Sequence, residues 1–484
     1  MRAARSVSVE QASSSSGRNL DRAGTGMDAL YFRPDRPMLQ LMQRIAFSVA
    51  DTAFIVFLVL VLCTPAWRTG PFTWWPVWQA PVSHSASGHP LEAIQLGLLS
   101  LLPVLCTLAW GGGRLLLRST QPVVWRWKAV TMLLPLLALS LLILRGLDPA
   151  LTERTIVQVV GLGLFWFSYL YVLDRRPGLT LPLLLVVMVQ GSVAVAQFGL
   201  QRDLGLASLG EFPLDPQVLG TSVLWSSEEV WLRGYGLTAH PNVLGAVLAV
   251  LLLVLLPQLR QRRGWQFAIL GAGLAVGLLG LLVSFSRTGW LAFLSGLTVW
   301  VWSQKTSAGA EQSKIQNPGC PLGPKIIWMP FALVPVFLFF YHDLILSRWT
   351  QLDTAIEARS IQERLRDAEV ALALIGAHPW TGVGAGNELA AAQAVRSDAG
   401  AVHSVSLLVM AELGILGGII WLLFMLLPLL LHRFHLYRPA WIGLLIAGLF
   451  DTPLWLTTSW RAALLLGLLA ALQVQALDGK KEDA

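Results

Sequence analysis

Charged residues and cysteines are scarce in this sequence, and their scarcity already limits the class of protein. Of the 484 residues, 13% are charged and 55% are hydrophobic, whereas a soluble domain carries about 25% charged residues. The low charge excludes an ordinary soluble globular protein. Cys63, Cys106 and Cys320 are too widely spaced for a disulfide framework or a zinc site, so we expect them to be small apolar residues.

The sequence also lacks a soluble basic module. The net charge of +7 would suit a nucleic-acid partner, but loops that face the cytoplasm and anionic lipid explain the same excess in a membrane protein. We therefore expect no nucleic-acid binding. Residues 1–40 are rich in Ser, Gly and Arg and lack the apolar core of a cleavable signal, so we expect a disordered cytoplasmic tail.

Long apolar segments, in contrast, are abundant. Apolar runs of about 20 residues separated by short basic loops are typical of transmembrane helices, and the mean hydropathy is +0.61. Without strand alternation or internal repeats, we predict an all-α, polytopic membrane protein with about 12 transmembrane helices. They form a single domain, residues 41–478, and lie near residues 46–66, 92–110, 129–145, 155–173, 179–199, 241–258, 265–285, 288–303, 326–342, 404–431, 439–458 and 461–477.

Lysine is absent from alternate loops, and this absence predicts the orientation. If the N-terminal tail is cytoplasmic, every lysine falls on that side, together with the arginine clusters at 175–176 and 260–263. Both termini are then cytoplasmic. Tryptophans within residues 67–91 indicate an outer aromatic belt. Two long outer loops result, at about 200–239 and 343–402.

The loop at 343–402 is a polar island between strongly apolar runs. A helix is predicted from about Ala355 to Ile375, because Ile361, Leu365, Ala368 and Leu372 form an apolar stripe with charged residues around it. Gly376, Pro379 and the following glycines end that helix. The loop also holds several arginines on the side that is usually poor in them: Arg348, Arg359, Arg364, Arg366 and Arg396. Anion binding would explain them.

Three arginines are candidates for such a site. Arg233 stands just before the sixth predicted helix; the alternative is an arginine that extends to the membrane surface. Arg287 lies between two abutting apolar runs, where a charge is costly unless it is paired, and a guanidinium there can hold a phosphate with two hydrogen bonds. Arg364 has only Asp367 as an acid at helical spacing.

The other charges of the loop helix have a simpler explanation. Arg359 with Glu363, and Arg366 with Glu369, have the spacing of ion pairs along a solvated helix. Arg359 is kept as a secondary candidate for the site.

His403 opens the tenth predicted helix and is the candidate catalytic base. Histidine accepts a proton near neutral pH, and nearby arginines favour its neutral form; the alternative is a capping or interfacial residue. His240 and His378 each precede a proline and are expected to be turn residues. Glu412 and Asp451 lie inside predicted helices, where they could orient an arginine or the histidine, or form structural pairs.

These residues together match a known pattern. In order and spacing, the chain resembles the O-antigen ligase and O-antigen polymerase-like family of bacterial envelope proteins, over roughly residues 230–430 by motif and over the whole chain by topology. The motifs are Arg233 with His240-Pro241-Asn242, Ser286-Arg287-Thr288-Gly289-Trp290, Arg364 followed by His378-Pro379-Trp380-Thr381-Gly382-Val383-Gly384, and His403-Ser404 followed by Glu412-Leu413-Gly414 and Gly417. The family histidine is often followed by asparagine; Ser404 keeps a polar group there.

The resemblance implies inverting, metal-independent glycosyl transfer at the outer face of the bacterial plasma membrane, without a cofactor. The donor would be a glycan on a polyprenyl diphosphate, and the acceptor a hydroxyl of the lipid A core or of a lipid-linked glycan. Arg287 and Arg364, assisted by Arg233, would hold the diphosphate, and His403 would be the general base. The absence of an Asp-rich metal motif agrees with this chemistry.

Other functions stay open at this point. A polymerase would extend a polyprenyl-linked chain by the same chemistry, and relatives of this family are described as inorganic-carbon transporters. A transporter is expected to show polar sites in mid-membrane, broken helices and often inverted repeats, whereas the candidate cations here cluster at one membrane face. A purely structural scaffold would leave the arginines unexplained.

Overall fold

A computed structural model describes the chain at residues 36–63, 78–79, 95–96, 101–117, 127–147, 153–209, 211–218, 220–226, 229–311, 324–350, 355–431, 436–452, 455 and 460–478. Residues 1–35 of the tail expected at 1–40 lie outside the described residues. Most of the tryptophan belt predicted at 67–91 also lies outside them. Helix dominates the described part, and there is almost no sheet, so the all-α prediction is confirmed.

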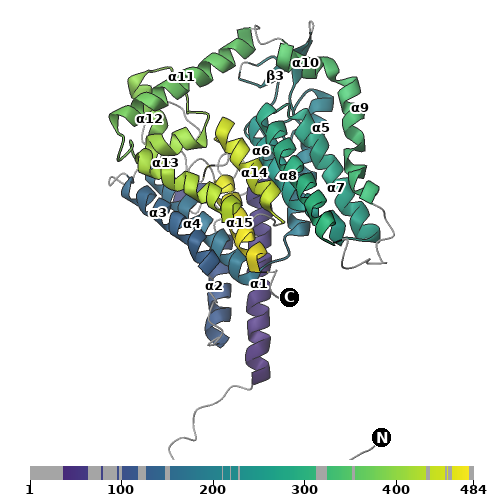
Figure 1. Ribbon diagram of the computed structural model, residues 1–484, viewed down its shortest axis with the longest axis vertical. Helices are drawn as coiled ribbons and strands as arrows, with labels where there is room; N and C mark the ends of the chain where they lie inside the picture. The colour runs from purple at the N-terminus through teal and green to yellow at the C-terminus, as the bar shows by residue number, and fades with distance from the viewer. Residues whose placement is uncertain are drawn as a thin grey trace, which may run out of the picture.

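The helices and strands follow one another as a chain of long helices with a few short elements between them (Figure 1). The α-helices are α1 (Arg36–Cys63), α2 (Leu101–Leu117), α3 (Trp127–Arg145), α4 (Glu153–Arg175), α5 (Thr180–Leu200), α6 (Pro241–Leu255), α7 (Gly264–Val283), α8 (Arg287–Glu311), α9 (Leu333–Phe340), α10 (His342–Thr350), α11 (Ala355–Ala377), α12 (Glu388–Val395), α13 (Val405–Leu431), α14 (Arg438–Phe450) and α15 (Trp460–Asp478). The 3-10 helices are η3 (Ala207–Leu209), η4 (Leu256–Gln261) and η5 (Pro324–Ala332), and the strands are β1 (Trp78–Gln79), β2 (Gln95–Leu96), β3 (Val223–Ser226) and β4 (Glu229–Leu232).

By length and composition, 5 helices of the described residues can cross a membrane. They are Met38–Cys63, Thr180–Leu200, Pro241–Gln261, Gly264–Val283 and Val405–Leu430. Shorter apolar helices coincide with further predicted spans: Leu101–Leu115, Leu133–Arg145, Trp328–Phe340, Arg438–Phe450 and Trp460–Gln475. The count of about 12 spans, the periplasmic assignment of the loops and the orientation of the termini stay predictions.

Several helix boundaries differ clearly from the predicted runs. Helix α1 begins at Arg36 instead of near residue 46, so it includes the end of the segment expected to be a disordered tail, and α8 ends at Glu311 instead of near residue 303. Helix α2 begins at Leu101 instead of near residue 92, which places Pro103 in the first helical turn, where proline is tolerated. Helix α14 ends at Phe450 instead of near residue 458. Asp451 after it is extended, and the chain reaches Pro453 two residues later, so proline ends this helix.

Two short strand pairs were not predicted. In the longer one, β3 and β4 pair antiparallel, with Val223 opposite Leu232 and Ser226 opposite Glu229. Strands of four residues are too short for alternation to be recognised reliably in the sequence. This hairpin packs against α10.

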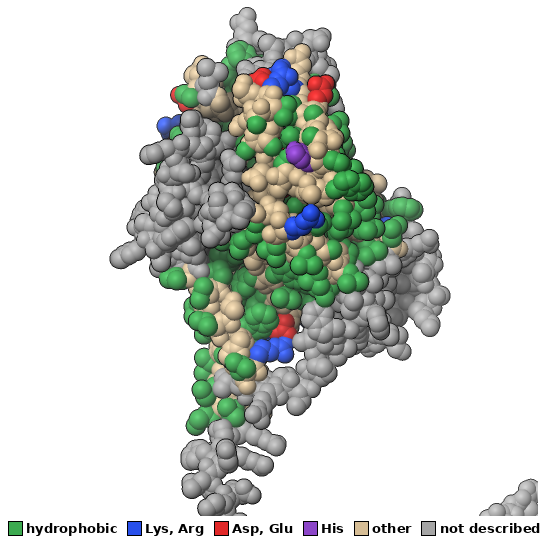
Figure 2. Space-filling view, turned by 90° about the vertical axis from the view of Figure 1, so that its left-hand side faces the viewer, with side chains coloured by type: hydrophobic (Ala, Val, Ile, Leu, Met, Phe, Trp, Pro, Cys, Tyr) green, Lys and Arg blue, Asp and Glu red, His purple; other side chains and the backbone are tan. Residues whose placement is uncertain are grey.

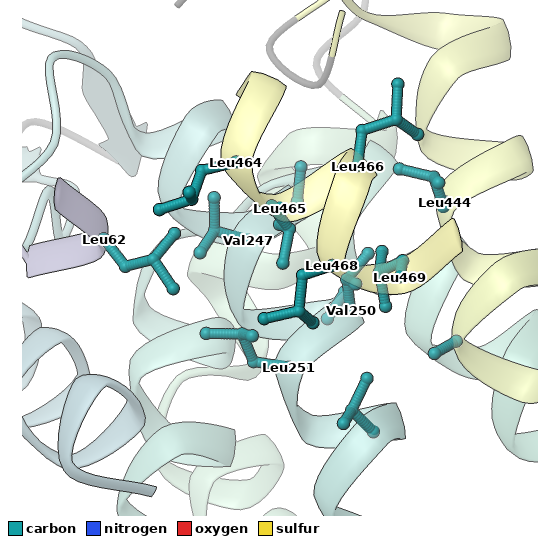
Figure 3. Packing of buried hydrophobic residues seen from close by; sticks show 14 of the residues in the cluster. Leu62, Val247, Val250, Leu251, Leu444, Leu464, Leu465, Leu466, Leu468 and Leu469 are labelled. Atoms are coloured by element: carbon teal, nitrogen blue, oxygen red, sulfur yellow. The ribbon is translucent and has the colours of Figure 1, made fainter. Parts of the chain in front are cut away.

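The long helices pack side by side around α6 and α15. Helix α1 packs on α2, α4 on α15, α5 on α7, and α14 on α8, whereas α6 contacts α7, α8 and α14. The central helices are the most enclosed: 89% of the apolar window of Pro241–Gln261 is buried. Figure 3 shows residues of α6 and α15 packed together, including Val250 and Leu468. An apolar surface all round is expected of a helix surrounded by protein.

The outer surface is also largely hydrophobic, as lipid contact requires. Figure 2 shows one face on which basic, acidic and histidine side chains form only small groups among hydrophobic ones. Leucines on three helices are strongly exposed: Leu108 is 69% exposed, Leu181 72% and Leu430 75%. Such exposure would favour aggregation in water but is normal in a bilayer.

Ion pairs join three helices of the bundle. Arg175 of α4 binds Asp51 of α1, with Nη2 at 2.8 Å from Oδ2. One residue earlier, Asp174 pairs with Arg114 of α2 and accepts a hydrogen bond from Trp110 Nε1. Isolated charges in a membrane are costly, so these pairs fix α1, α2 and α4 relative to one another.

The candidate site residues belong to one end of the bundle. In Figure 1, β3, α10 and α11 lie together at that end, and α1 extends from the opposite end. Helix α10 leads into α11, and β3 contacts α10. The chain reaches the same end again between α7 and α8, because the backbone N–H of Gly234, just after β4, donates to Val283 O at 2.8 Å.

Helices α6 and α8 touch through glycine, and this contact predicts a sensitive position. A Cβ on Gly289 would lie 2.7 Å from the backbone C of Gly245, which no side chain tolerates. Close backbone approach through small residues is how membrane helices associate. We predict that Gly289→Val destabilises the protein by about 1–3 kcal/mol or more, through overpacking. Thermal unfolding of the purified protein, followed by tryptophan fluorescence, measures this.

The matched control is Gly271→Ala, because a Cβ at Gly271 in α7 meets open space. It should melt at or above the wild-type temperature. Equal melting of Gly289→Val and wild type would contradict the tight crossing of α6 and α8.

Candidate functional site

The turn between α7 and α8 holds one group of the predicted site residues. Only Ser284, Phe285 and Ser286 separate the two helices, and Phe285 has a left-handed backbone with φ of 45°. This conformation is unfavourable for an aromatic residue, so its surroundings must stabilise it. Phe285 is fully buried, and its ring packs against Phe198 and Phe337. Packing therefore holds the turn in one conformation.

Arg233 lies behind this turn and binds protein acceptors. It is only 4% exposed. Its Nε donates to Ser284 O at 2.8 Å, Nη1 to Ser222 Oγ at 2.7 Å and Nη2 to Asn242 Oδ1 at 2.9 Å. The alternative that Arg233 extends to the surface is therefore wrong. Its contact with a diphosphate stays a prediction; the observed bonds tie the α7–α8 turn to the start of α6.

The start of α6 agrees with the sequence analysis. Pro241 is the first helical residue, and His240 precedes it as the N-cap. The Nδ1 atom of His240 accepts a hydrogen bond from the backbone N–H of Asn242 at 3.1 Å. His240 is thus a turn residue, as predicted, and it orients the same asparagine that binds Arg233.

Arg287 is the first residue of α8 and is half-buried beside the turn. The hydroxyl of Ser286 caps this helix by accepting from Gly289 N–H at 3.1 Å. A helix N-terminus carries partial positive charge, and an arginine there adds a full charge. This end of α8 therefore has the electrostatics of an anion site, and the phosphate contact of Arg287 stays a prediction.

A second group of site residues lies on α11, which confirms the predicted helix. Arg364 is half-buried, and in the described part of the chain it has no hydrogen bond or ion pair. Asp367, one turn further, does not pair with it. This carboxylate is 4% exposed, and its Oδ1 accepts from the backbone N–H of Gly400 at 2.9 Å. The charge of Arg364 is therefore available to a ligand.

His403 lies next to Asp367, just before α13. Its Nδ1 is 3.6 Å from Asp367 Oδ2, an ion-pair contact somewhat longer than a hydrogen bond. Of the two ring nitrogens, Nδ1 is buried and Nε2 is not, and 37% of the side chain is exposed. One nitrogen therefore faces a carboxylate and the other faces outward, the arrangement that a general base needs.

Sequence analysis missed a second buried carboxylate, Glu388 at the start of α12. It is 2% exposed, and its Oε1 accepts from the backbone N–H of Val402 at 3.3 Å. Burial, and to a lesser degree the charge of Asp367, raise the pKa of Glu388 to about 7. Asp367 and Glu388 thus both bind the segment that carries His403, through Gly400 and Val402.

The glycine-rich segment after α11 binds protein rather than offering its amides to a phosphate. Helix α13 is kinked at Gly414, which has φ of 76° and ψ of 178°. Val383 N–H donates to Ala411 O at 2.9 Å, and Gly384 N–H donates to Glu412 O at 3.0 Å. In return, the backbone N–H of Ile415 donates to Pro379 O at 2.8 Å. The segment therefore joins α11 to the kink of α13.

The apolar stripe that predicted α11 does not face the core. Ile361 is 38% exposed, Leu365 62% and Leu372 57%. The buried side of the helix instead carries Asp367 together with Val370, Ala371 and Leu374. The helix was predicted correctly and its buried side was not, because a sequence does not tell which of two stripes on a helix is covered.

One predicted ion pair of this helix is also replaced. Arg366 binds Asp398 at 2.9 Å instead of Glu369, and Arg396 binds the same carboxylate at 2.7 Å. A hydrogen bond from Arg396, and the charges of both arginines, lower the pKa of Asp398. Arg366 and Arg396 are therefore engaged near the site, unlike Arg364.

The secondary candidates differ in their surroundings. Glu412 is 3% exposed, two residues before the kink of α13. Asp451 follows the end of α14. Near that end, Gly448 packs against Val405 at the start of α13. Asp451 and His403 therefore lie at the same end of the molecule. The side chain of Arg359 lies outside the described residues. Their roles stay predictions.

Metal ligands do not gather in the described part of the chain: no three His, Cys, Asp or Glu side chains there are arranged to hold an ion.

Comparison with known families gives a match over part of the chain. Residues 272–422 match the family model described as O-antigen ligase, and no curated protein matches the chain. This region is O-antigen ligase-like, and it contains Arg287, Arg364 and His403, whereas Arg233 and Asp451 lie outside it. The match supports glycosyl transfer of the O-antigen ligase or polymerase type, in lipopolysaccharide biosynthesis, by a multi-pass protein of the bacterial inner membrane with lipid-linked glycan substrates.

The raised pKa of Glu388 predicts a pH-dependent stability. Between its ordinary value of 4.5 and about 7, the folded protein holds a proton that the unfolded chain has released. Stability therefore falls as pH rises through this window. Glu388→Gln should remove this part of the dependence, at most about 3 kcal/mol. Melting temperatures at pH 5 and pH 8 measure it.

The exposed carboxylate of Glu369 provides the matched control. Glu369→Gln should melt like the wild type at both pH values. The same pH slope in Glu388→Gln and wild type would contradict the buried, protonated state of Glu388.

Proposed function

We propose that this chain transfers a glycan from a polyprenyl diphosphate to the lipid A core, or to another lipid-linked sugar, at the periplasmic face of the membrane. The observation that carries this proposal is the His403 ring, which has Nδ1 buried beside Asp367 and Nε2 accessible. His403 lies within the O-antigen ligase-like region. Its contact with Asp367 places the ring beside α11, the helix that also carries Arg364.

The arginines bind the diphosphate of the donor. Arg364 makes no other polar contact in the described part of the chain, and Arg287 adds its charge to the N-terminus of α8. A guanidinium binds phosphate oxygens with two parallel hydrogen bonds. Arg233 assists by holding the turn that precedes Arg287, because its Nε binds Ser284 O.

His403 activates the acceptor. Its Nε2 takes the proton of the acceptor hydroxyl while the oxygen attacks the anomeric carbon from the side opposite the diphosphate. The bond from that carbon to the diphosphate oxygen breaks, the electron pair leaves with the diphosphate, and the configuration inverts. The arginines stabilise the charge that develops on the leaving group, and the proposed transfer uses no metal ion.

Deletion of the gene in its host tests the function and separates two acceptors. The envelope polysaccharide is run on a gel with and without a plasmid copy of the gene. Loss of all long chains from lipid A supports a ligase, and decoration with a single repeat unit supports a polymerase. An unchanged pattern would overturn glycosyl transfer, and impaired uptake of inorganic carbon would then indicate a transporter.

His403→Ala tests the mechanism. Since a general base contributes about 10²–10⁴-fold, we expect transfer to fall by at least about 100-fold while the melting temperature stays unchanged. The assay uses the purified protein with donor glycolipid and lipid A core extracted from the deletion strain. His378→Ala is the matched control, because His378 is an exposed turn residue of the same region and should leave transfer intact. Wild-type activity in His403→Ala would exclude His403 as the base.

A further inference from the structure

Asp367 is placed where it can control which nitrogen of His403 carries the proton. Its Oδ2 lies 3.6 Å from Nδ1, and the carboxylate is 4% exposed. The buried Nδ1 has no hydrogen-bond partner in the described part of the chain. A shift of a few tenths of an ångström would make the bond, and such contacts often shorten when substrate binds.

The carboxylate is itself fixed. Its other oxygen, Oδ1, accepts from Gly400 N–H at 2.9 Å, so Asp367 binds both the ring and the backbone of the segment before it. Glu388 binds the same segment by accepting from Val402 N–H. Residues 400–403 are therefore held by two buried carboxylates, only one of which contacts the ring.

We propose that Asp367 is the positioning residue of His403: it holds the proton on Nδ1, leaves Nε2 free to accept the proton of the acceptor hydroxyl, and stabilises the imidazolium that results. The proposal rests on the glycosyl transfer proposed above. A carboxylate on one nitrogen of a catalytic histidine acts in this way in unrelated enzymes. Asp367 pairs with neither Arg364 nor any other arginine or lysine in the described region, and the contact with His403 gives this acid a function.

Asp367→Asn tests the proposal with little change of shape. The amide oxygen can still accept from Gly400 N–H, so the fold is retained. The amide nitrogen, however, donates to Nδ1 and favours the tautomer with its proton on Nε2, which cannot act as a base. We expect turnover to fall by about 10²–10⁴-fold, as for removal of the base, with little change in the KM for the donor. Asp367→Glu should recover part of the activity.

The pH profile separates positioning from a structural role. Asp367 contacts the ring, Glu388 binds the preceding residue Val402, and Arg364 lies one turn before Asp367 on α11. Loss of the carboxylate beside the ring should move the acid limb of the kcat/KM profile to lower pH and lower its maximum. Because the pKa of Glu388 is raised to about 7, its own titration contributes to the profile, and the profile is therefore also recorded with Glu388→Gln present in both proteins.

Asp398→Asn is the matched control, an identical substitution at an exposed carboxylate of the same region. It should keep wild-type turnover and the wild-type pH profile. Activity of Asp367→Asn within a few-fold of wild type, or a uniform loss without a shift of the acid limb, would overturn the proposal. If Asp367→Asn does not fold, Asp367→Glu decides, since a positioning role requires measurable activity with a shifted profile.

The outcomes also distinguish this inference from the proposed function. If His403→Ala is inactive and Asp367→Asn is active, only the positioning role of Asp367 is excluded. If transfer persists in His403→Ala, the mechanism on which both proposals depend is excluded.

Discussion

The arrangement of the site depends on one constraint, that a backbone polar group freed inside a membrane protein must find a protein partner. The kink of α13 at Gly414 breaks the regular helical pattern, so Ala411 O accepts from Val383 N–H while Ile415 N–H donates to Pro379 O. Gly382 permits the close approach, since a Cβ there would lie 2.3 Å from the backbone of Glu412. These hydrogen bonds hold the end of α11 against α13. Because His403 lies just before α13, they also fix the histidine relative to α11.

The same constraint divides the arginines into those that build the site and those that can act in it. Arg233 is buried and gives hydrogen bonds to Ser284, Ser222 and Asn242, so it stabilises the turn before Arg287. Arg366 and Arg396 share Asp398. Arg364 has no polar partner among the described residues, although Asp367 lies one turn away. A cation close to a membrane without a partner is unfavourable unless a ligand provides the opposite charge, and we propose that a lipid-borne diphosphate is this ligand.

Sequence reasoning was reliable where local chemistry decides, and less so where packing decides. The helix of α11, the proline start of α6 and the abrupt α7–α8 turn were predicted from periodicity and breakers. The buried side of α11 was not, because the apolar stripe through Leu365 is exposed and the opposite side carries Asp367. A carboxylate at helical spacing from Val370 and Leu374 is a signal for a buried acid, but a sequence does not tell which of two stripes is covered. Glu388 gave no signal at all, since its burial depends on residues distant in the chain.

The sequence by itself determined the membrane class, the helices and the residue types of the chemistry, because hydropathy, helical period and the placement of arginine and histidine are local properties. It also determined the family resemblance, which residues 272–422 support. Only the tertiary structure decided which charges are satisfied: that Arg233 is engaged, that Arg366 binds Asp398, and that a buried carboxylate lies beside Nδ1 of His403. The reason is that the partner of a buried polar group comes from whichever segment packs against it, and spacing along the chain does not contain that information.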